Sequence, residues 1–485
     1  MAKKNKAAHK RQRQLQEKKA GEKLSINRLR RYDELFFHII VFGFFFLAPL
    51  PFVSGFSPRG VTIFTLYNLP KYLFLCPAAF LIGFFFVLSL SYNDERRKQT
   101  REYIRRNWGL RLLLLFFVFQ ALSLTGASVR QNALLQLIIY FSFIQLFVVL
   151  SILFQQRKLL YASLFGVALS LLIVCPLGIM QFFKVQLPFL LPIKGPAATF
   201  GYRNPAGHYL VLNIPFAAYL AYRFQRAESK KSHPGRRLFM VFLFSFLSLI
   251  ALIHTFMTTT RTAILALLLY SLLLPVFHLF QLRKKQALSW HAWLKTAMAT
   301  MGVAILIIGC LMAFPQSRRR VMASIKKTGS LSILEARRYH WGNTLYMIKD
   351  HPLMGVGLGN WRFNYPLYMH RYSKDPCYSF RVQVLKAHND YLQIGAECGL
   401  GALFIFLCLW GRQFYLAGKG DHRFANEYFH YPLFCSLLAL SAIMMFSFPL
   451  QLGYSRMYLF YLLALGESSI PPGREIIDKS TLSSS

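Results

Sequence analysis

Long apolar segments recur along this chain and alternate with polar connections. They lie at 35–56, 72–91, 110–127, 133–154, 159–182, 205–222, 238–257, 262–282, 296–314, 391–411, 432–450 and 455–466. An α-helix needs about 20 residues to cross the hydrocarbon core of a bilayer, and most of these segments reach that length. The pattern predicts an all-α fold, a polytopic membrane bundle of about 12 transmembrane helices.

The distribution of Lys and Arg predicts the orientation of the bundle, because these residues concentrate in cytoplasmic loops. Residues 1–34 form a basic tail that we expect in the cytoplasm. We expect helices 1–9 within 35–314, a periplasmic loop over 315–387, helices 10–12 within 388–466 and a cytoplasmic C-terminal tail over 467–485. The chain is thus predicted to be a multi-pass protein of the bacterial inner membrane.

The predicted loop 315–387 departs from the charge pattern of the other external connections. It holds many Lys and Arg, but its only acidic residues are Glu335, Asp350 and Asp375. A long loop can cross the membrane regardless of its charge, so the topology stands. The excess of positive charge calls for an anionic partner, either lipid headgroups or a phosphorylated substrate.

Helical periodicity within this loop predicts an amphipathic helix over Leu331–Ile348. Its apolar stripe consists of Leu334, Trp341, Leu345 and Ile348. Arg337 and Arg338 flank the stripe almost symmetrically, and the helical wheel does not separate their roles. A helix of this kind also suits the membrane surface, with arginines that extend toward the headgroups.

A glycine run, Gly355–Gly359, follows this helix after Pro352. Such a run permits a tight turn and a close approach of the backbone to a ligand. It is weak evidence for a phosphate-binding loop, because neither a strand nor a Lys-Ser/Thr pair frames it.

The composition agrees with a membrane protein, since 55% of the residues are hydrophobic and only 15% are charged. The net charge of +39 is explained by attraction to anionic lipid, and no nucleic-acid recognition module is visible, so we expect membrane lipids and no nucleic acid as partners. The seven cysteines have no CxxC spacing, which argues against a disulfide framework or a zinc site.

Four clusters on the predicted outer face are candidates for chemistry: Arg203/Asn204, Arg261, Arg337/Arg338 and His388. His388 lies at the junction of the polar loop and an apolar helix, with Asn389 or Asp390 available to cap the helix start. We expect His388 to point into the bundle, on the face of Gly395 and Gly399, although a hydrogen-bonded interfacial histidine is the alternative.

Arginines form the rest of the candidate site. Arg261 follows three threonines in a very short outer connection, where it either extends to the interface or serves function. Arg203 and Asn204 form a further polar cluster at the outer end of a span. Arginine matches phosphate oxygens bidentately, and a histidine can remove a proton from a hydroxyl. Together they suit attack by an alcohol on a carbon that bears a diphosphate leaving group.

At these residues the chain resembles the O-antigen ligase and polymerase superfamily of bacterial envelope glycosyltransferases. The resemblance covers about Thr199 to Gly401. It rests on Thr199-Phe200-Gly201-Tyr202-Arg203-Asn204-Pro205, Thr260-Arg261-Thr262-Ala263-Ile264-Leu265, Arg337 four residues before Trp341, His351-Pro352-Leu353-Met354-Gly355-Val356-Gly357-Leu358-Gly359-Asn360 and His388-Asn389-Asp390-Tyr391-Leu392-Gln393.

The resemblance implies transfer of a glycan from undecaprenyl diphosphate to an acceptor hydroxyl on the periplasmic face, without metal, nucleotide or other cofactor. The acceptor would be the lipid A core, another glycan or a protein. Arg261 matches the family's first arginine, Arg337 its loop arginine and His388 its proposed base, while Thr260 replaces the usual serine.

We therefore expect His388, Arg261 and Arg337 to be catalytic. We expect five further residues to bind substrate: Arg338, Arg203, Asn204, Asn389 and Asp390. Ligase activity is the predicted function. A polymerase that uses the same donor class is the alternative, and a transporter of lipid-linked glycans is a more distant one.

Overall fold

The computed structural model describes residues 32–52, 63–185, 195–226, 234–284, 286–287, 289–315, 318–319, 333–372, 383–419 and 428–468. Every regular element in these ranges is helical, and they contain no strand. The predicted all-α fold class is therefore confirmed.

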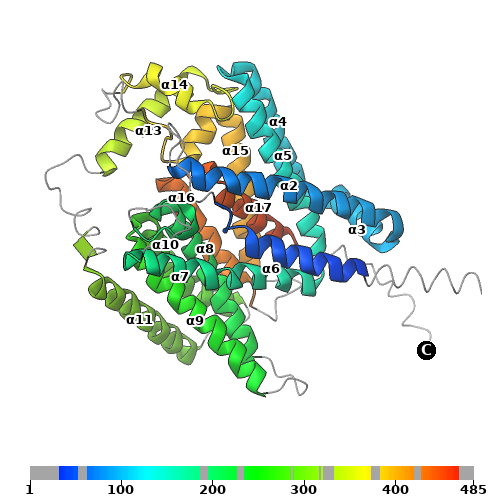
Figure 1. Cartoon of the computed structure of the whole chain (residues 1–485), viewed down its shortest axis with the longest axis vertical. Helices are drawn as coiled ribbons and strands as arrows, with labels where there is room; N and C mark the ends of the chain where they lie inside the picture. The colour runs from blue at the N-terminus through cyan, green and yellow to red at the C-terminus, as the bar shows by residue number, and fades with distance from the viewer. Residues whose placement is uncertain are drawn as a thin grey trace, which may run out of the picture.

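The helices follow one another along the chain as labelled in Figure 1. After a first helix over 32–47 come α2 (Ile63–Tyr92), α3 (Asp94–Arg106), α4 (Trp108–Leu122), η1 (Ser123–Gly126), α5 (Arg130–Leu153), α6 (Arg157–Leu169), α7 (Leu171–Phe182), η2 (Ala198–Phe200), α8 (Arg203–Arg226), α9 (Pro234–Thr258), α10 (Arg261–Lys284), α11 (Trp290–Ala313), α13 (Ile333–Asp350), α14 (Trp361–Tyr368), α15 (Asp390–Lys419), α16 (His430–Phe446), η4 (Pro449–Gln451) and α17 (Gly453–Ser468).

Seven stretches of the described chain are long and apolar enough to cross a membrane. They are Leu66–Tyr92, Trp108–Gly126, Arg130–Leu153, Arg157–Phe182, Pro234–Thr258, Arg261–Lys284 and Asp390–Lys419. These helices point to a membrane protein. The other five predicted segments also contain helix, namely 32–47, α8, α11, α16 and α17. They are not among the seven, so the number of twelve spans stays a prediction.

Two helix boundaries near the N-terminus differ from the predicted ones. The first helix ends at residue 47, ahead of Pro49 and Pro51, because proline disfavours helix in the residue before it. Conversely, α2 begins at Ile63 and continues through Pro70 and Pro77, although the sequence suggested a loop up to Pro70. Proline is tolerated within membrane helices because neighbouring groups satisfy the freed carbonyls.

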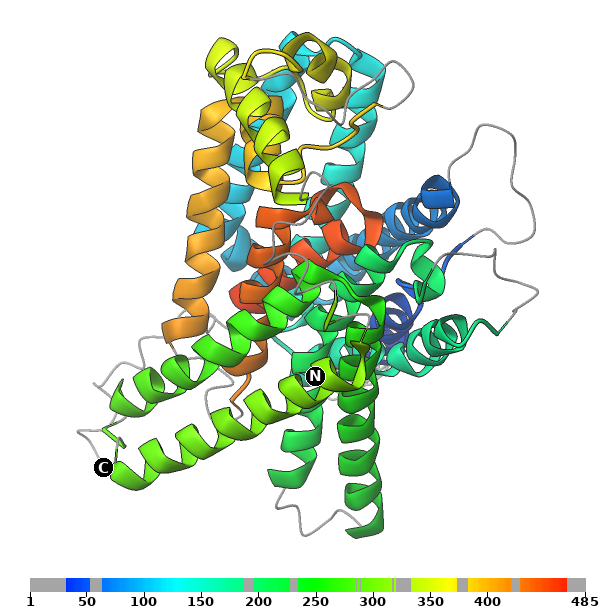
Figure 2. The same cartoon turned by 90° about the vertical axis from the view of Figure 1, so that its left-hand side faces the viewer.

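The C-terminal helix α17 lies in the interior of the bundle (Figure 2). Every one of its residues is buried, and it packs against α2, α5, α8, α15 and α16. Its 16 residues matched the shortest predicted segment, at 455–466. Because its side chains face protein on all sides, this helix forms the core around which the outer helices pack.

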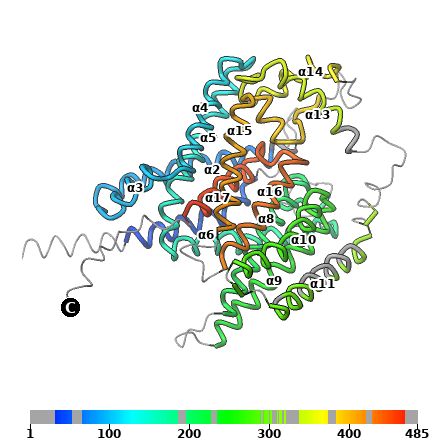
Figure 3. The backbone as a smooth tube through the Cα atoms, turned by 180° about the vertical axis from the view of Figure 1, so that it is seen from behind, coloured from blue at the N-terminus to red at the C-terminus, as the bar shows by residue number. Residues whose placement is uncertain are grey.

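The helices α13 and α14 lie on a different side of the bundle from helix α3. α13 and α14 lie together beside the start of α15, as both Figure 1 and Figure 2 show. α3 projects on the side away from α11 and α13, which is clearest from behind in Figure 3. The predicted outer-face residues on α13 are therefore far from the basic helix α3.

The buried face of α13 differs from the predicted apolar stripe. Leu345 is 54% exposed, whereas Asn343 and Thr344 are fully buried. The amide of Tyr372 donates to Asn343 Oδ1 (2.8 Å), and Trp361 Nε1 donates to Thr344 Oγ1 (3.1 Å). These hydrogen bonds compensate for burial of the polar groups. Of the predicted stripe, Ile348 is buried and Trp341 half-buried, Leu345 contradicts the prediction, and the side chain of Leu334 lies outside the described residues.

Candidate active site

The turn before α8 presents Arg203 and is fixed by contacts with α2. Gly201 adopts a left-handed φ of 69°, and a Cβ at this position would lie 2.4 Å from the Tyr67 ring. Lys71 Nζ donates to the carbonyl oxygens of Thr199 (2.6 Å), Tyr67 (3.0 Å) and Pro51 (2.9 Å). A buried ammonium with three carbonyl partners holds this turn in place, so α2 positions the start of α8.

A threonine turn between α9 and α10 brings Arg261 beside Arg203. Thr258 Oγ1 accepts from the amide of Thr260 (3.2 Å), and Thr259 has a φ of 55°. Thr260 Oγ1 donates to the Arg203 carbonyl oxygen (3.1 Å). A β-branched residue with positive φ is strained, so the surrounding contacts must hold this turn.

The structure separates Arg337 from Arg338, which the helical wheel left equivalent. Arg338 is exposed, and its Nε donates to the Tyr372 hydroxyl (2.9 Å). Arg337 is half-buried and lies within electrostatic range of Arg261 and His388. Adjacent helical residues point about 100° apart, and here that angle places only Arg337 toward the other predicted catalytic groups.

His388 lies two residues before α15 in a left-handed conformation, with a φ of 56°. Its ring is stacked with His340 of α13, with centroids 5.9 Å apart, and meets the edge of Phe448 at 4.9 Å. Because His388 precedes the helix, the argument from its helical face does not apply. The two flanking rings orient the imidazole instead.

Arg203, Arg261 and Arg337, which we name the cationic cluster, are each half-buried. No carboxylate forms an ion pair with any of them within the described ranges. The Nε atoms of Arg203 and Arg337 are buried and make no hydrogen bond there. An unsatisfied buried donor costs roughly 1–3 kcal/mol, and more when charged, so these groups suit an anionic ligand.

The charges of the site shift the pKa values of two of its members. Burial, followed by the charge of Arg261, lowers the pKa of Arg337 to about 10. Burial lowers the pKa of His388 to about 4, with smaller contributions from Arg337 and His340. Arg337 therefore remains charged at neutral pH, while His388 is a neutral imidazole that can accept a proton.

Residues 244–407 match the family model described as O-antigen ligase. This match supports a relationship of the chain to the O-antigen ligase superfamily. The matched segment includes Arg261, Arg337 and His388, while Arg203 and Asn204 lie before it. A search of curated proteins found no match.

The matched O-antigen ligase domain indicates an enzyme of the glycosyltransferase or ligase type. It also implies lipid-linked glycan and acceptor substrates in general. Thr260, which stands where the resemblance suggests serine, supplies a hydroxyl hydrogen bond to the turn at Arg203. The substitution therefore retains a local polar contact.

The two residues after His388 make hydrogen bonds within the protein. Asn389 Oδ1 accepts from the amide of Leu392 (3.1 Å) and thereby caps α15. Asp390 Oδ2 accepts from the amide of Leu450 (2.9 Å). Both side chains are buried, and these contacts fix the segment that carries His388, while direct binding of substrate by the two residues stays a prediction.

The glycine run is tied to the protein itself. The amides of Gly359 (2.9 Å) and Trp361 (3.4 Å) both donate to the Glu397 carboxylate, and the amide of Gly357 donates to the Glu397 carbonyl oxygen (2.9 Å). The amides of Val356 and Leu358 also have protein acceptors. Since these donors are occupied, the run is a structural turn and not a phosphate-binding loop.

Gly399 explains why this turn can reach α15. Its φ of 85° and ψ of 170° interrupt the helix, and a Cβ there would lie 2.0 Å from the Leu353 carbonyl oxygen. A Cβ on Gly395 would contact Ile348 of α13 at 3.2 Å. These two glycines therefore permit close approach of α13 and of the turn that follows it to α15.

Sequence reasoning missed three contributors to the site. His340 lies one helical turn after Arg337, so helical periodicity contained a signal for it. Lys71 was a charged residue at the edge of an apolar segment, which is a functional hint by itself. Phe448 had no distinguishing signal, because one aromatic residue among many becomes special only through its contact with His388.

Asn204 lies in the first turn of α8 and is half-buried. Within the described residues, no group of three or more His, Cys, Asp or Glu is arranged to hold a metal ion.

Proposed function

We propose that this chain is a ligase-type glycosyltransferase of the bacterial inner membrane. It would move a glycan from undecaprenyl diphosphate to a hydroxyl of the lipid A core, or of a similar glycan or protein acceptor, at the periplasmic face. The observation that carries the proposal is the cationic cluster, whose charges have no carboxylate partner within the described ranges.

A diphosphate meets the needs of this cluster. It supplies several anionic oxygens, and a guanidinium can bind two of them with parallel hydrogen bonds. The unsatisfied Nε atoms of Arg203 and Arg337 would gain acceptors, and the repulsion between Arg337 and Arg261 would be relieved. Both effects favour the bound state over the empty one.

In the proposed reaction, His388 takes the proton of the acceptor hydroxyl. The acceptor oxygen forms a bond to the anomeric carbon of the glycan, and the bond from that carbon to the diphosphate oxygen breaks. The electron pair of this bond leaves with undecaprenyl diphosphate, and Arg261 and Arg337 stabilise its added negative charge. The proton leaves later from His388 to water.

The charges that hold the donor also tune the proposed base. After burial, the charge of Arg337 contributes most to the low pKa of His388. A bound diphosphate would offset the charge of Arg337 and raise the pKa of His388 toward neutrality, where a general base is more effective. Donor binding would thus strengthen the base before the acceptor reacts.

The remaining predicted site residues have supporting parts in the proposal. Arg203 and Asn204, at the start of α8, would complete the donor site beside Arg261. Arg338 lies at the exposed rim, where it would contact the glycan or lipid headgroups. Asn389 and Asp390 would hold the segment that carries His388.

The test uses purified protein and a purified lipid-linked donor with an acceptor. His388→Ala should lower the transfer rate by about 10²- to 10⁴-fold, the contribution typical of a positioned base. His351→Ala is the matched control, because His351 is an exposed histidine in the turn after α13. Near-normal transfer by His388→Ala would refute the assigned role.

A polymerase is the second candidate, because the family comprises ligases and polymerases. Such an enzyme would use a second lipid-linked glycan as its acceptor and make a ladder of products, whereas a ligase makes one new linkage. Formation of any covalent product in detergent would exclude a pure transporter of lipid-linked glycans, since detergent leaves no membrane to cross.

A further inference from the structure

The short helix α3 joins two candidate membrane spans at one face of the bundle. The first span ends at Tyr92 and the second begins at Trp108, while α3 occupies Asp94–Arg106 between them. A helix in this position must lie at the level of the lipid headgroups on that face. It is the part of the described chain most suited to contact phosphates of the bilayer.

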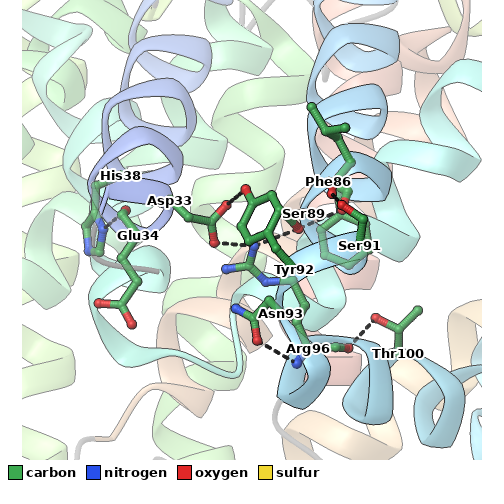
Figure 4. A network of polar contacts seen from close by, with 11 residues as sticks. Asp33, Glu34, His38, Phe86, Ser89, Ser91, Tyr92, Asn93, Arg96 and Thr100 are labelled. Carbon is green, nitrogen blue, oxygen red and sulfur yellow. Dashed lines mark hydrogen bonds and ion pairs between the residues drawn. The ribbon is translucent and has the colours of Figure 1, made fainter. Parts of the chain in front are cut away.

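One side of α3 is held firmly against the protein (Figure 4). Arg96 Nη1 lies 2.6 Å from Asp33 of the first helix and donates to Ser89 Oγ of α2 (2.8 Å). Thr100 and Tyr103, on the same side of α3, are also buried. This anchoring sets the rotation of the helix and leaves its other side directed outward.

A groove of about 400 Å³ runs along an outward side of α3 at its junction with α2. Its lining residues are Leu90, Arg97, Thr100, Arg101, Ile104 and Arg105. The Arg97 guanidinium donates to the carbonyl oxygens of Leu90 (2.8 Å) and Ser91 (3.0 Å). Arg97 therefore closes the end of α2 and forms one wall of the groove.

The other two arginines of the groove are available to a ligand. The side chains of Arg101 and Arg105 are exposed, and within the described ranges neither makes an ion pair or a hydrogen bond. They are one helical turn apart on the same side, so both guanidinium groups can reach one phosphate.

Apolar residues lie beside the arginines, where they can contact the acyl chains of a lipid whose phosphate the arginines bind. Ile104 is 53% exposed and Leu90 half-buried, and both line the groove. Trp108, which is 62% exposed, carries the Arg111 guanidinium 4.7 Å from its ring. Tryptophan and arginine in this arrangement are typical of the membrane interface.

We propose that this groove binds the headgroup of an anionic glycerophospholipid, with Arg101 and Arg105 on the phosphate and Leu90 and Ile104 against the acyl chains. The charge complementarity selects an anionic lipid, because the cationic group of a zwitterionic lipid would face the same arginines. The site is remote from the cationic cluster and independent of the proposed reaction.

The experiment measures lipid binding to the purified full-length protein in mild detergent by native mass spectrometry. The probes are phosphatidylglycerol and phosphatidylcholine. The wild-type chain should retain phosphatidylglycerol preferentially. Each basic residue near an anionic surface contributes about fivefold in binding, so the double variant Arg101→Gln/Arg105→Gln should bind phosphatidylglycerol about 25-fold more weakly.

The matched control is Lys98→Gln/Arg106→Gln, which removes the same charge from exposed positions of α3 outside the groove. It should keep most of the binding. If the two double variants lose equal amounts of phosphatidylglycerol binding, general charge attraction explains the binding and the proposal is overturned. Equal retention of the two lipids by the wild type would also overturn it. If the first double variant does not fold, Arg105→Gln alone should still lose about fivefold.

Discussion

Two regions of this protein hold arginines whose partners differ, namely the region of α3 and the cationic cluster. In the region of α3, Arg96 pairs with Asp33 at 2.6 Å, and both side chains are buried. Arg412 of α15 has a similar partner, because its Nε donates to Glu467 Oε1 of α17 at 2.7 Å. In the cationic cluster, by contrast, no arginine has a carboxylate partner within the described residues.

The difference teaches that burial alone does not assign a role to an arginine. A paired buried arginine joins helices, and removing one partner leaves the other charge uncompensated. An arginine buried without a partner raises the energy of the empty protein and is stabilised when an anion binds. We infer that the first arrangement serves the fold, and we propose that the second serves a ligand.

The largest expected effect is loss of stability at the paired site. Arg96→Met should leave Asp33 buried and unpaired, at a cost of about 3–5 kcal/mol, which thermal unfolding in detergent will measure. The transfer rate per folded molecule should stay unchanged, because α3 is remote from the cationic cluster.

A second variant sharpens this prediction. Asp33→Leu combined with Arg96→Met removes both charges, and replacement of a whole buried pair by apolar residues is often neutral. The double variant should therefore recover most of the lost stability. If the double variant is as unstable as Arg96→Met, Arg96 stabilises the fold through its contacts with the Phe37 ring and Ser89 and not through the ion pair.

The next effect concerns the unpaired site. Arg337→Gln should lower the transfer rate by about 10²- to 10³-fold, as expected when a group that stabilises transition-state charge is removed. Its thermal stability should not fall, because Arg337 repels Arg261 in the empty protein. Steady-state kinetics and thermal unfolding of the same preparation give both values.

Arg338→Gln is the matched control for Arg337→Gln. It removes the same charge from the neighbouring position, whose side chain is exposed and bonded to Tyr372. We expect at most a small change in rate. Loss of activity in Arg338→Gln together with retention in Arg337→Gln would exchange the two roles.

The smallest effect is a shift in pH dependence. Burial, followed by the electrostatic contributions of Arg337 and His340, lowers the pKa of His388, while Phe448 on the other side carries no charge. His340→Phe keeps a ring against His388 but removes the electrostatic contribution of the imidazole, so the pKa of His388 should rise. The acid limb of the kcat/KM profile should move to higher pH by less than about one unit.

This shift has a definite sign because a protonated base is inactive. A higher pKa of His388 means that activity is lost earlier as the pH falls. An unchanged acid limb, or one displaced to lower pH, would show that His340 supports the ring of His388 without influencing its protonation.

Much of the fold could be predicted because hydrophobic periodicity is a local property of the chain. Each of the twelve apolar segments contains helix, and the helix over residues 333–350 matches its predicted range closely. The rotation of α13 could not be predicted, since Asn343 and Thr344 are buried through partners distant in sequence. Likewise, nothing local marks α17 as the central helix.

The sequence by itself determined the helical class, the basic character and the set of residues from which a site could be made, because composition and spacing carry that information. Only the tertiary structure decided that Arg337 lies near Arg261 while Arg338 points outward. It also decided that amides of the glycine run donate hydrogen bonds to Glu397. The physical reason is that the role of a charge or an amide depends on its partner. Partners are chosen when helices pack.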